Sequence, residues 1–217
     1  KVSDETLAAW AQILSAVPSS RLLLKSAAFS SEEGRTAALA RLQAAGIDSE
    51  RVELRPDTHE YLHEYHDVDI ALDTFPYPGG GTTFDALYMG VPVVMLKGDS
   101  HGTRFGFSIL ANLGLEDLAA ADAADYVRKA AALAEDTQIL AALHKNLRPM
   151  MEKSPLMDGA SYTAALEAGC EAALAAHDAA QTLPSPEEAA RLAVTLKRFF
   201  AAGDLRQALA ASDALLA

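Results

Sequence analysis

The chain has 217 residues, 50% of them hydrophobic, one cysteine and a formal net charge of −12 at pH 7. This length and composition predict one domain with a sizeable core plus an appendage. The negative charge argues against nonspecific nucleic-acid binding, because such binding needs Lys and Arg to neutralise phosphates. The single cysteine, Cys170, excludes an internal disulfide and a thiolate metal cluster, and its Ala-rich helical surroundings predict a small packing residue.

The apolar runs are far shorter than a membrane span, and the N-terminus lacks the basic-then-apolar pattern of a signal peptide. We therefore expect a soluble cytoplasmic protein that has neither a membrane nor a nucleic acid as its partner. Basic residues in such an acidic chain are expected to act locally, at a specific ligand site.

Helices and strands are predicted to alternate along the first part of the chain. Ser3, followed by two acidic residues, is typical of a helix start, and Pro18 marks the end of that helix. Ser30 with Glu33 matches a capping box. The predicted elements are a helix over 3–17, a strand over 21–25, a helix from 30 to 46 and a strand over 52–54. This alternation predicts an α/β fold whose parallel sheet is covered by helices on both faces.

The stretch THEYLHEYH (58–66) contains a literal H-E-x-x-H match in His59, Glu60 and His63. In that motif two histidines one turn apart bind zinc, and the glutamate acts as a base. The segment is short and lies between two predicted strands, and no clear third ligand follows before the glycine-rich loop. We therefore favour an amphipathic helix that packs Leu62 and Tyr65 inward, and we expect no metal site.

The rest of the chain is organised around the stretch from Asp69 to Arg104. It predicts a strand over 70–72, a turn rich in Pro and Gly, a helix over 82–89 and a strand over 91–96. The loop GGGTT (79–83) meets the helix start, where unpaired N–H groups and two hydroxyls suit an anion such as a diphosphate. Asp85, one turn after Thr82, is placed to accept hydrogen bonds from sugar hydroxyls.

Two alternatives remain open for this loop and its neighbourhood. The loop could be a flexible turn with Thr82 as helix N-cap, since neither a Walker pattern nor a dinucleotide glycine pattern is complete. Arg104 falls in the first turn of a further predicted helix, where a cation opposes the helix dipole. An anionic partner would offset that cost, and a salt bridge to Asp99 is favoured over a bound phosphate.

The C-terminal part is predicted to be helical and rich in alanine. Gln181 to Pro186 has the composition of a linker, and the residues around Gly203 resemble a single tetratricopeptide-type helix pair. One such pair cannot bury its own apolar face, so it is expected to dock on the main domain, another chain or a longer array. The predicted helices cover 123–134, 137–151 and 161–177, and the predicted domains are 1–178, a linker over 179–186 and the helical pair over 187–217.

Three motifs in order carry a more specific signal: LDTFPYPGGGTTFDALYMGVPVV, HGTRFGFSILANLGL and SPLMDGASYTAALEA. Together they resemble the C-terminal lobe of the O-GlcNAc transferase family, the SPINDLY-type glycosyltransferases linked to tetratricopeptide repeats. The resemblance covers most of the chain from Lys1 to about Ala176. It implies a Rossmann-like parallel sheet, the C-terminal lobe of a GT-B fold. It also implies a nucleotide-sugar donor, UDP-GlcNAc by family default, and transfer of the sugar to Ser or Thr hydroxyls of a protein acceptor.

The resemblance also implies roles for particular residues. Lys1 matches a lysine that neutralises charge on the leaving diphosphate and would be catalytic, whereas the remaining matched residues would bind the donor. Thr58 replaces a lysine that contacts the nucleotide in the family, Tyr61 stands where relatives often carry a base-stacking histidine, and Gly80 stands where some carry histidine. The implied donor-binding set is Thr58, Tyr61, Gly79, Gly80, Gly81, Thr82, Thr83, Asp85 and Arg104.

No metal or other cofactor is expected, because the helix termini, Thr82 and Lys1 would take the place of a cation at the diphosphate. The resemblance further implies that an N-terminal lobe and a tetratricopeptide array come from missing sequence or from another chain. The chain would then be an incomplete fragment. Two alternatives are a non-catalytic interaction module, in which the glycine loop is structural, and an epimerase-like enzyme acting on nucleotide sugars.

Overall fold

The computed structural model describes residues 2–180 and 185–201. It divides into two compact units, Lys1–Asp158 and Gly159–Ala217, and each is described by itself. The helices and strands of the first unit are α1 (Asp4–Ala16), β1 (Leu22–Lys25), α2 (Glu32–Ala44), β2 (Val52–Arg55), β3 (Ala71–Leu72), α3 (Gly81–Tyr88), β4 (Val93–Leu96), α4 (Phe105–Ala111), β5 (Ala119–Ala120), α5 (Ala123–Glu135) and α6 (Thr137–Glu152). Short 3-10 helices join them, at Ala27–Ser30, Ser49–Arg51, Tyr61–Asp67 (η3), Gly102–Arg104, Glu116–Leu118 and Pro155–Met157.

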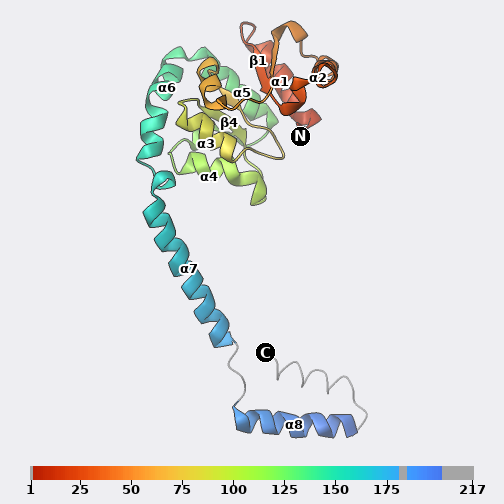
Figure 1. The fold of residues 1–217 in the computed structure, drawn as a ribbon, viewed down its shortest axis with the longest axis vertical. Coiled ribbons are helices and arrows are strands. Elements are labelled where there is room, and N and C mark those ends of the chain that lie inside the picture. Colours follow the sequence, from red (N-terminus) through yellow and green to blue (C-terminus); the bar gives the residue numbers. More distant parts are fainter. Residues whose placement is uncertain (1, 181–184, 202–217) are drawn as a thin grey trace. The chain divides into compact units, whose positions relative to one another are not determined.

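The first unit is an α/β structure in which every strand pair is parallel, as the sequence predicts (Figure 1). β1 pairs with β2, with Leu22 opposite Val52. β4 lies between β3 and β5, with Ala71 opposite Val93. The strands therefore form two small parallel sheets rather than one, and helices pack around them.

β4 is covered on both faces, as the predicted parallel sheet requires. Val94 belongs to a core cluster that includes Trp10 of α1 and Tyr126 of α5. Its neighbours Val93 and Met95 belong to a second cluster formed with α3, α4 and α6. All three β4 residues are at most 2% exposed, because successive side chains of a strand point to opposite faces and both faces are packed.

Local capping explains where the first two helices begin. Ser3 caps α1, and its hydroxyl accepts the backbone N–H of Thr6 at 3.1 Å. The cap of α2 is Ser31, whose hydroxyl accepts the N–H of Gly34 at 3.1 Å, so the predicted capping box of Ser30 is wrong by one residue. Ser30 instead ends a 3-10 turn that precedes the helix.

Other boundaries also differ from those predicted. The segment expected to be an amphipathic helix is the 3-10 helix η3, in which Leu62 and Tyr65 are half-buried. β3 and β4 are shorter than predicted, and the two-residue strand β5 carries too short a pattern to be recognised in sequence. α3 begins at Gly81 and ends at Tyr88, within a residue of its prediction.

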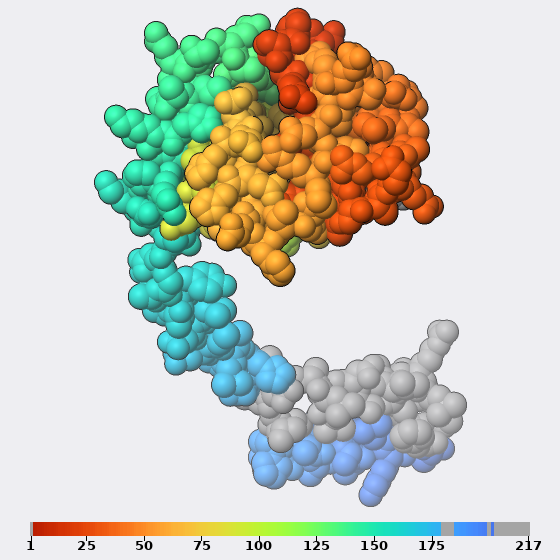
Figure 2. Space-filling view, turned by 45° about the horizontal axis from the view of Figure 1, so that its top comes forward, coloured from red at the N-terminus to blue at the C-terminus, as the bar shows by residue number. Residues whose placement is uncertain are grey.

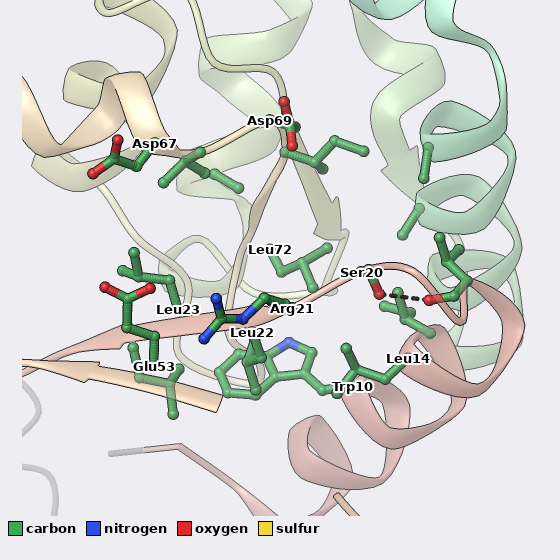
Figure 3. Close-up of a pocket in the computed structure, with 18 of the residues that line it drawn as sticks. Trp10, Leu14, Ser20, Arg21, Leu22, Leu23, Glu53, Asp67, Asp69 and Leu72 are labelled. Atoms are coloured by element: carbon green, nitrogen blue, oxygen red, sulfur yellow. Dashed lines mark hydrogen bonds between the residues drawn. The ribbon is translucent and has the colours of Figure 1, made fainter. Parts of the chain in front are cut away.

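A cavity of about 690 Å³ lies in the first unit, lined by residues of α1, β1 and β3 among others. Figure 3 shows Trp10, Leu22 and Leu72 in its lining, with the charged side chains of Glu53 and Asp67 also part of it. Figure 2 shows this unit hollowed between the red N-terminal part of the chain and the orange segment that includes η3. The walls combine apolar side chains with charged ones of both signs, among them Arg21, Lys25 and Arg55.

The second unit contains α7 (Gly159–Ala180) and α8 (Pro186–Ala201). Cys170 on α7 is exposed, so the predicted packing role for it is wrong. α8 is the first helix of the predicted tetratricopeptide-like pair, whereas the second helix and half of the linker lie outside the described residues. The predicted domain boundaries stay a prediction. Within the described residues, no helix is long and apolar enough to cross a membrane.

Candidate functional site

The glycine-rich loop leaves the sheet at the carboxyl end of β3, where Asp73 folds the chain back on itself. One carboxylate oxygen of Asp73 accepts the N–H of Gly79 at 2.6 Å and the N–H of Thr74 at 2.9 Å. The other oxygen, Oδ2, is buried without a hydrogen-bond partner. Ligands of open α/β sheets bind at this carboxyl edge, so the loop stands where a ligand is expected.

Helices α5 and α1 hold the backbone of the same loop. Tyr126 of α5 donates its hydroxyl to the carbonyl of Asp73 at 2.9 Å, and the indole N–H of Trp10 donates to that hydroxyl at 3.2 Å. Thr6 of α1 donates to the carbonyl of Phe75 at 2.8 Å and accepts its N–H at 3.2 Å. Thr6 and Tyr126 are fully buried, so these bonds are shielded from water.

Position 79 of this loop is crowded by neighbouring side chains. A Cβ atom there would lie 2.6 Å from the hydroxyl of Thr82 and 2.8 Å from that of Thr83. At Gly80 and Gly81 a Cβ would meet nothing within 4 Å. The loop is therefore tight against the protein at its first glycine and open at the next two, where a ligand has room.

The N-terminus of α3 offers unpaired backbone donors to that open side. Gly80 is the N-cap, no side chain caps the helix, and its first turn contains no acidic residue. The alternative of Thr82 as N-cap is therefore wrong. The first N–H groups of a helix and its dipole together favour an anion, and among the described residues no side chain caps these groups. Thr82 is exposed beside these groups, whereas the side chain of Thr83 is only 3% exposed.

Asp85 lies on α3 itself, and two tyrosines of η3 lie beside this helix. The Asp85 carboxylate accepts the hydroxyl of Tyr61 at 3.0 Å, and this bond raises the pKa of Tyr61. The hydroxyl of Tyr65 donates to the carbonyl of Thr82 at 3.4 Å. A small recess of about 120 Å³ is lined by Tyr65, Asp73 and Thr82 among others. The structure thus brings Tyr61 into contact with Asp85, which lies on the same helix as Thr82.

The carboxyl group of Asp73 is electrostatically unusual. It is 9% exposed, and burial raises its pKa to about 6, although the N–H groups of Gly79 and Thr74 partly counteract this. A Cβ at Gly106 of α4 would lie 3.1 Å from the unpaired oxygen, so α4 also abuts this group. Asp73 was not among the predicted site residues. Its position between a buried strand and a glycine loop is the signal that could have found it.

The remaining predicted residues lie at different places. The hydroxyl of Thr58 accepts a hydrogen bond from Lys25 at 2.7 Å, so it belongs to a cluster of charged groups beside η3. Arg104 is exposed and serves as N-cap residue of α4. Arg104 makes no ion pair within residues 2–180 and 185–201, so the favoured salt bridge to Asp99 is wrong.

Lys1 lies outside the described residues. Its neighbour Ser3, however, donates its hydroxyl to the carbonyl of Phe75 at 2.6 Å. The start of α1 is therefore bonded to the glycine loop segment.

The H-E-x-x-H match has no zinc-site geometry. Glu60 is the residue before the 3-10 helix η3, and His59 precedes it in a turn. The two histidines of the motif need one face of an α-helix to converge on a metal. In the part of the chain that the structure describes, no group of three or more His, Cys, Asp or Glu residues is placed to hold a metal ion.

These features define a class of protein: a parallel α/β domain with an uncapped helix and a glycine loop at the carboxyl edge of its sheet. Comparison with known proteins gives the family. A profile of Glycosyl transferase family 41 matches residues 1–166. The chain belongs to this family.

Curated relatives agree with this assignment. The chain is 43% identical over 170 residues to the probable UDP-N-acetylglucosamine–peptide N-acetylglucosaminyltransferase SPINDLY of Solanum lycopersicum, covering 77% of this chain and 18% of that protein. It is 30% identical over 165 residues to the UDP-N-acetylglucosamine–peptide N-acetylglucosaminyltransferase of Caenorhabditis elegans, covering 75% of this chain and 14% of that protein. The chain thus spans less than a fifth of the length of these relatives.

A solved structure supports the fold as well. A mutant of the O-GlcNAc transferase of Thermobaculum terrenum matches with a TM-score of 0.72 and 36% sequence identity. The match covers 76% of this chain and 32% of that chain. The predicted resemblance to the O-GlcNAc transferase and SPINDLY family is confirmed.

Proposed function

We propose that this chain is the nucleotide-sugar-binding lobe of a protein O-glycosyltransferase. It binds a UDP-linked donor, with N-acetylglucosamine as the sugar, and takes part in transferring that sugar to a Ser or Thr hydroxyl of a protein acceptor. The observation that carries the proposal is the uncapped N-terminus of α3 beside Gly80 and Gly81, in a chain of family 41. The acceptor-binding parts and a tetratricopeptide array belong to the proposed complete enzyme.

In this proposal each side of the site binds one part of the donor. Gly79, Gly80, Gly81 and the N–H groups of Thr82 and Thr83 hold the diphosphate, with the Thr82 hydroxyl as a further donor. Asp85 accepts the ribose hydroxyls. Tyr61 and Thr58 border the nucleobase.

Charge develops on the diphosphate as the bond between the sugar and its phosphate oxygen breaks. The fixed N–H groups of α3 stabilise that charge without reorganising. Arg104, which has no protein anion as partner within the described residues, and Lys1 add positive charge. Together these groups stabilise the negative charge on the diphosphate, as a bound metal ion does in other transferases.

Calorimetric titration of the chain with UDP, GDP and CMP tests the proposal. UDP is expected to bind in the micromolar range, and Asp85→Ala and Thr82→Ala are each expected to weaken it about tenfold through loss of a hydrogen bond to a charged or sugar group. Asp99→Ala, which changes an exposed carboxylate outside the loop, is the matched control and leaves the affinity within twofold. Absence of binding by all three nucleotides to the folded chain contradicts the donor site, and preference for GDP or CMP contradicts the uridine assignment.

A further inference from the structure

The 3-10 helix η3 carries two tyrosines to the donor site with little anchoring in the core, since only Tyr65 packs, partly buried, against the second cluster. None of its residues is buried, and no side chain caps its N-terminus. Yet the hydroxyl of Tyr61 reaches the Asp85 carboxylate at 3.0 Å, and the hydroxyl of Tyr65 reaches the carbonyl of Thr82 at 3.4 Å. Core packing of η3 is thus limited to partly buried side chains such as Tyr65, and polar contacts must supply the rest of its anchoring.

Charged groups at the carboxyl ends of β1 and β2 supply that anchor. The Glu64 carboxylate of η3 accepts hydrogen bonds from the ammonium of Lys25 and the hydroxyl of Thr58. Its other oxygen is buried and lies 3.7 Å from the guanidinium of Arg55. Arg55 also binds Asp67, at the end of η3, with a distance of 2.8 Å between Nη1 and Oδ2.

This cluster is more shielded than an ordinary surface ion pair. The side chains of Lys25, Glu64 and Arg55 are only 22–23% exposed. The hydrogen bonds from Lys25 and then Thr58 lower the pKa of Glu64, while its partial burial acts in the opposite direction. Glu64 is therefore ionised at neutral pH and attracts both cations at once.

We propose that Glu64, together with Lys25 and Arg55, is a positioning residue for the nucleoside half of the donor. It acts through η3, which it holds so that Tyr61 stays beside Asp85. The glycine loop, in contrast, is fixed by its own buried bonds and handles the diphosphate. This inference rests on the proposed donor site and deepens it, since it assigns nucleoside affinity to the charged groups Glu64, Lys25 and Arg55, which act through η3 and not by binding the ligand themselves.

The first test uses the chain without ligand. Hydrogen exchange is measured at the amides of His63 and Val68, which bond to the carbonyls of Glu60 and Tyr65 within and at the end of η3. Glu64→Gln is expected to speed exchange at both amides about fivefold or more, with the core of β4 unchanged. Glu152→Gln, which removes the exposed pair with Arg148, is the matched control. Unchanged exchange in η3 overturns the inference.

The second test separates the two halves of the donor. Glu64→Gln is expected to weaken UDP about fivefold while inorganic pyrophosphate changes by less than twofold, and Lys25→Arg, which keeps the ion pair, retains wild-type affinity. In the Tyr61→Phe background the Glu64→Gln effect is expected to shrink below twofold, because both changes remove the same contact. Equal weakening of UDP and pyrophosphate, or additive effects of the two substitutions, overturns the inference.

Failure of the proposed function would give a different pattern of UDP and pyrophosphate binding. If the wild-type chain binds neither UDP nor pyrophosphate, the donor site itself is wrong, and the inference falls with it. If wild-type binds both and only the variants behave contrary to expectation, the donor site stands and the role of Glu64 alone is wrong.

Discussion

The two segments that border the candidate site are held by opposite means. The glycine loop is tied to α1, α5 and β3 by hydrogen bonds of buried groups, among them Thr6, Asp73 and Tyr126. The 3-10 helix η3 has no fully buried residue, packs Tyr65 only partly against the core, and carries Glu64 in a partly exposed ionic cluster. Buried hydrogen bonds fix geometry almost independently of salt, whereas exposed ion pairs are screened by it. The loop is thus the rigid half of the site and η3 the adjustable half.

The largest effect on stability is expected at Gly79, where the glycine loop leaves no free space for a side chain. Gly79→Ala places a Cβ 2.6 Å from the Thr82 hydroxyl and 2.8 Å from that of the buried Thr83, so both side chains must move to relieve the clash. We expect a loss of about 3 kcal/mol in the free energy of unfolding, measured with denaturant, together with loss of UDP binding. Gly81→Ala, whose Cβ meets nothing within 4 Å, is the control and keeps stability within about 0.5 kcal/mol. Equal stability of the two variants would show that the loop is not tight.

The buried carboxyl group of Asp73 makes the rigid half sensitive to pH. Its folded pKa of about 6 lies above its ordinary value of 3.8, so the folded state binds the proton more tightly. Ionisation therefore opposes folding, and stability is lost as the pH rises between these two values. From pH 4 to pH 7 the wild type should lose about 2 kcal/mol relative to Asp73→Asn, measured by urea unfolding at each pH. A constant difference between the two proteins would place Asp73 in a wetter environment than the structure has.

The anchor from α1 is expected to be weaker but measurable. Thr6→Val removes a hydroxyl that donates to the Phe75 carbonyl and accepts its N–H, and that N–H then has no partner. Stability should fall by about 1.5 kcal/mol, by thermal or denaturant unfolding. In Thr163→Val the lost bond is an exposed one to the Gly159 carbonyl, and a change below about 0.5 kcal/mol is expected there. Equal losses of stability in the two variants would show that burial does not strengthen the hydrogen bonds of Thr6.

The smallest effect concerns salt and the adjustable half. Raising NaCl from 0.1 to 1 M shortens the screening length from about 10 Å to about 3 Å, which weakens the contacts of Glu64 with Lys25 and Arg55. Hydrogen exchange at the Val68 amide should then rise about twofold, whereas the Gly79 amide, bonded to the buried Asp73 carboxylate, should not change. A parallel response of both amides to salt would remove the distinction between the two halves.

The correct predictions are those that depend on residues close together in the sequence. Alternating helices and strands predicted the parallel α/β fold, and the glycine run predicted an open helix N-terminus. Errors arose where a local signal was ambiguous. Two adjacent serines precede α2, and only the one at position 31 caps it, because a 3-10 turn uses Ser30. The apolar spacing around Leu62 fits an α-helix as well as the observed 3-10 helix, since both bring residues three apart close together.

By itself the sequence determined the family, the alternation of the longer helices and strands, and the loop at which an anion is expected, because these depend on short-range pattern and on ordered motifs. Only the tertiary structure revealed how that loop is held. Thr6 and Phe75 are 69 residues apart in the chain, and Asp73 and Tyr126 are 53 apart. No local propensity encodes such pairs. They form because packing of α1 and α5 around the core brings their hydroxyls to the loop carbonyls, and burial then makes each bond costly to lose.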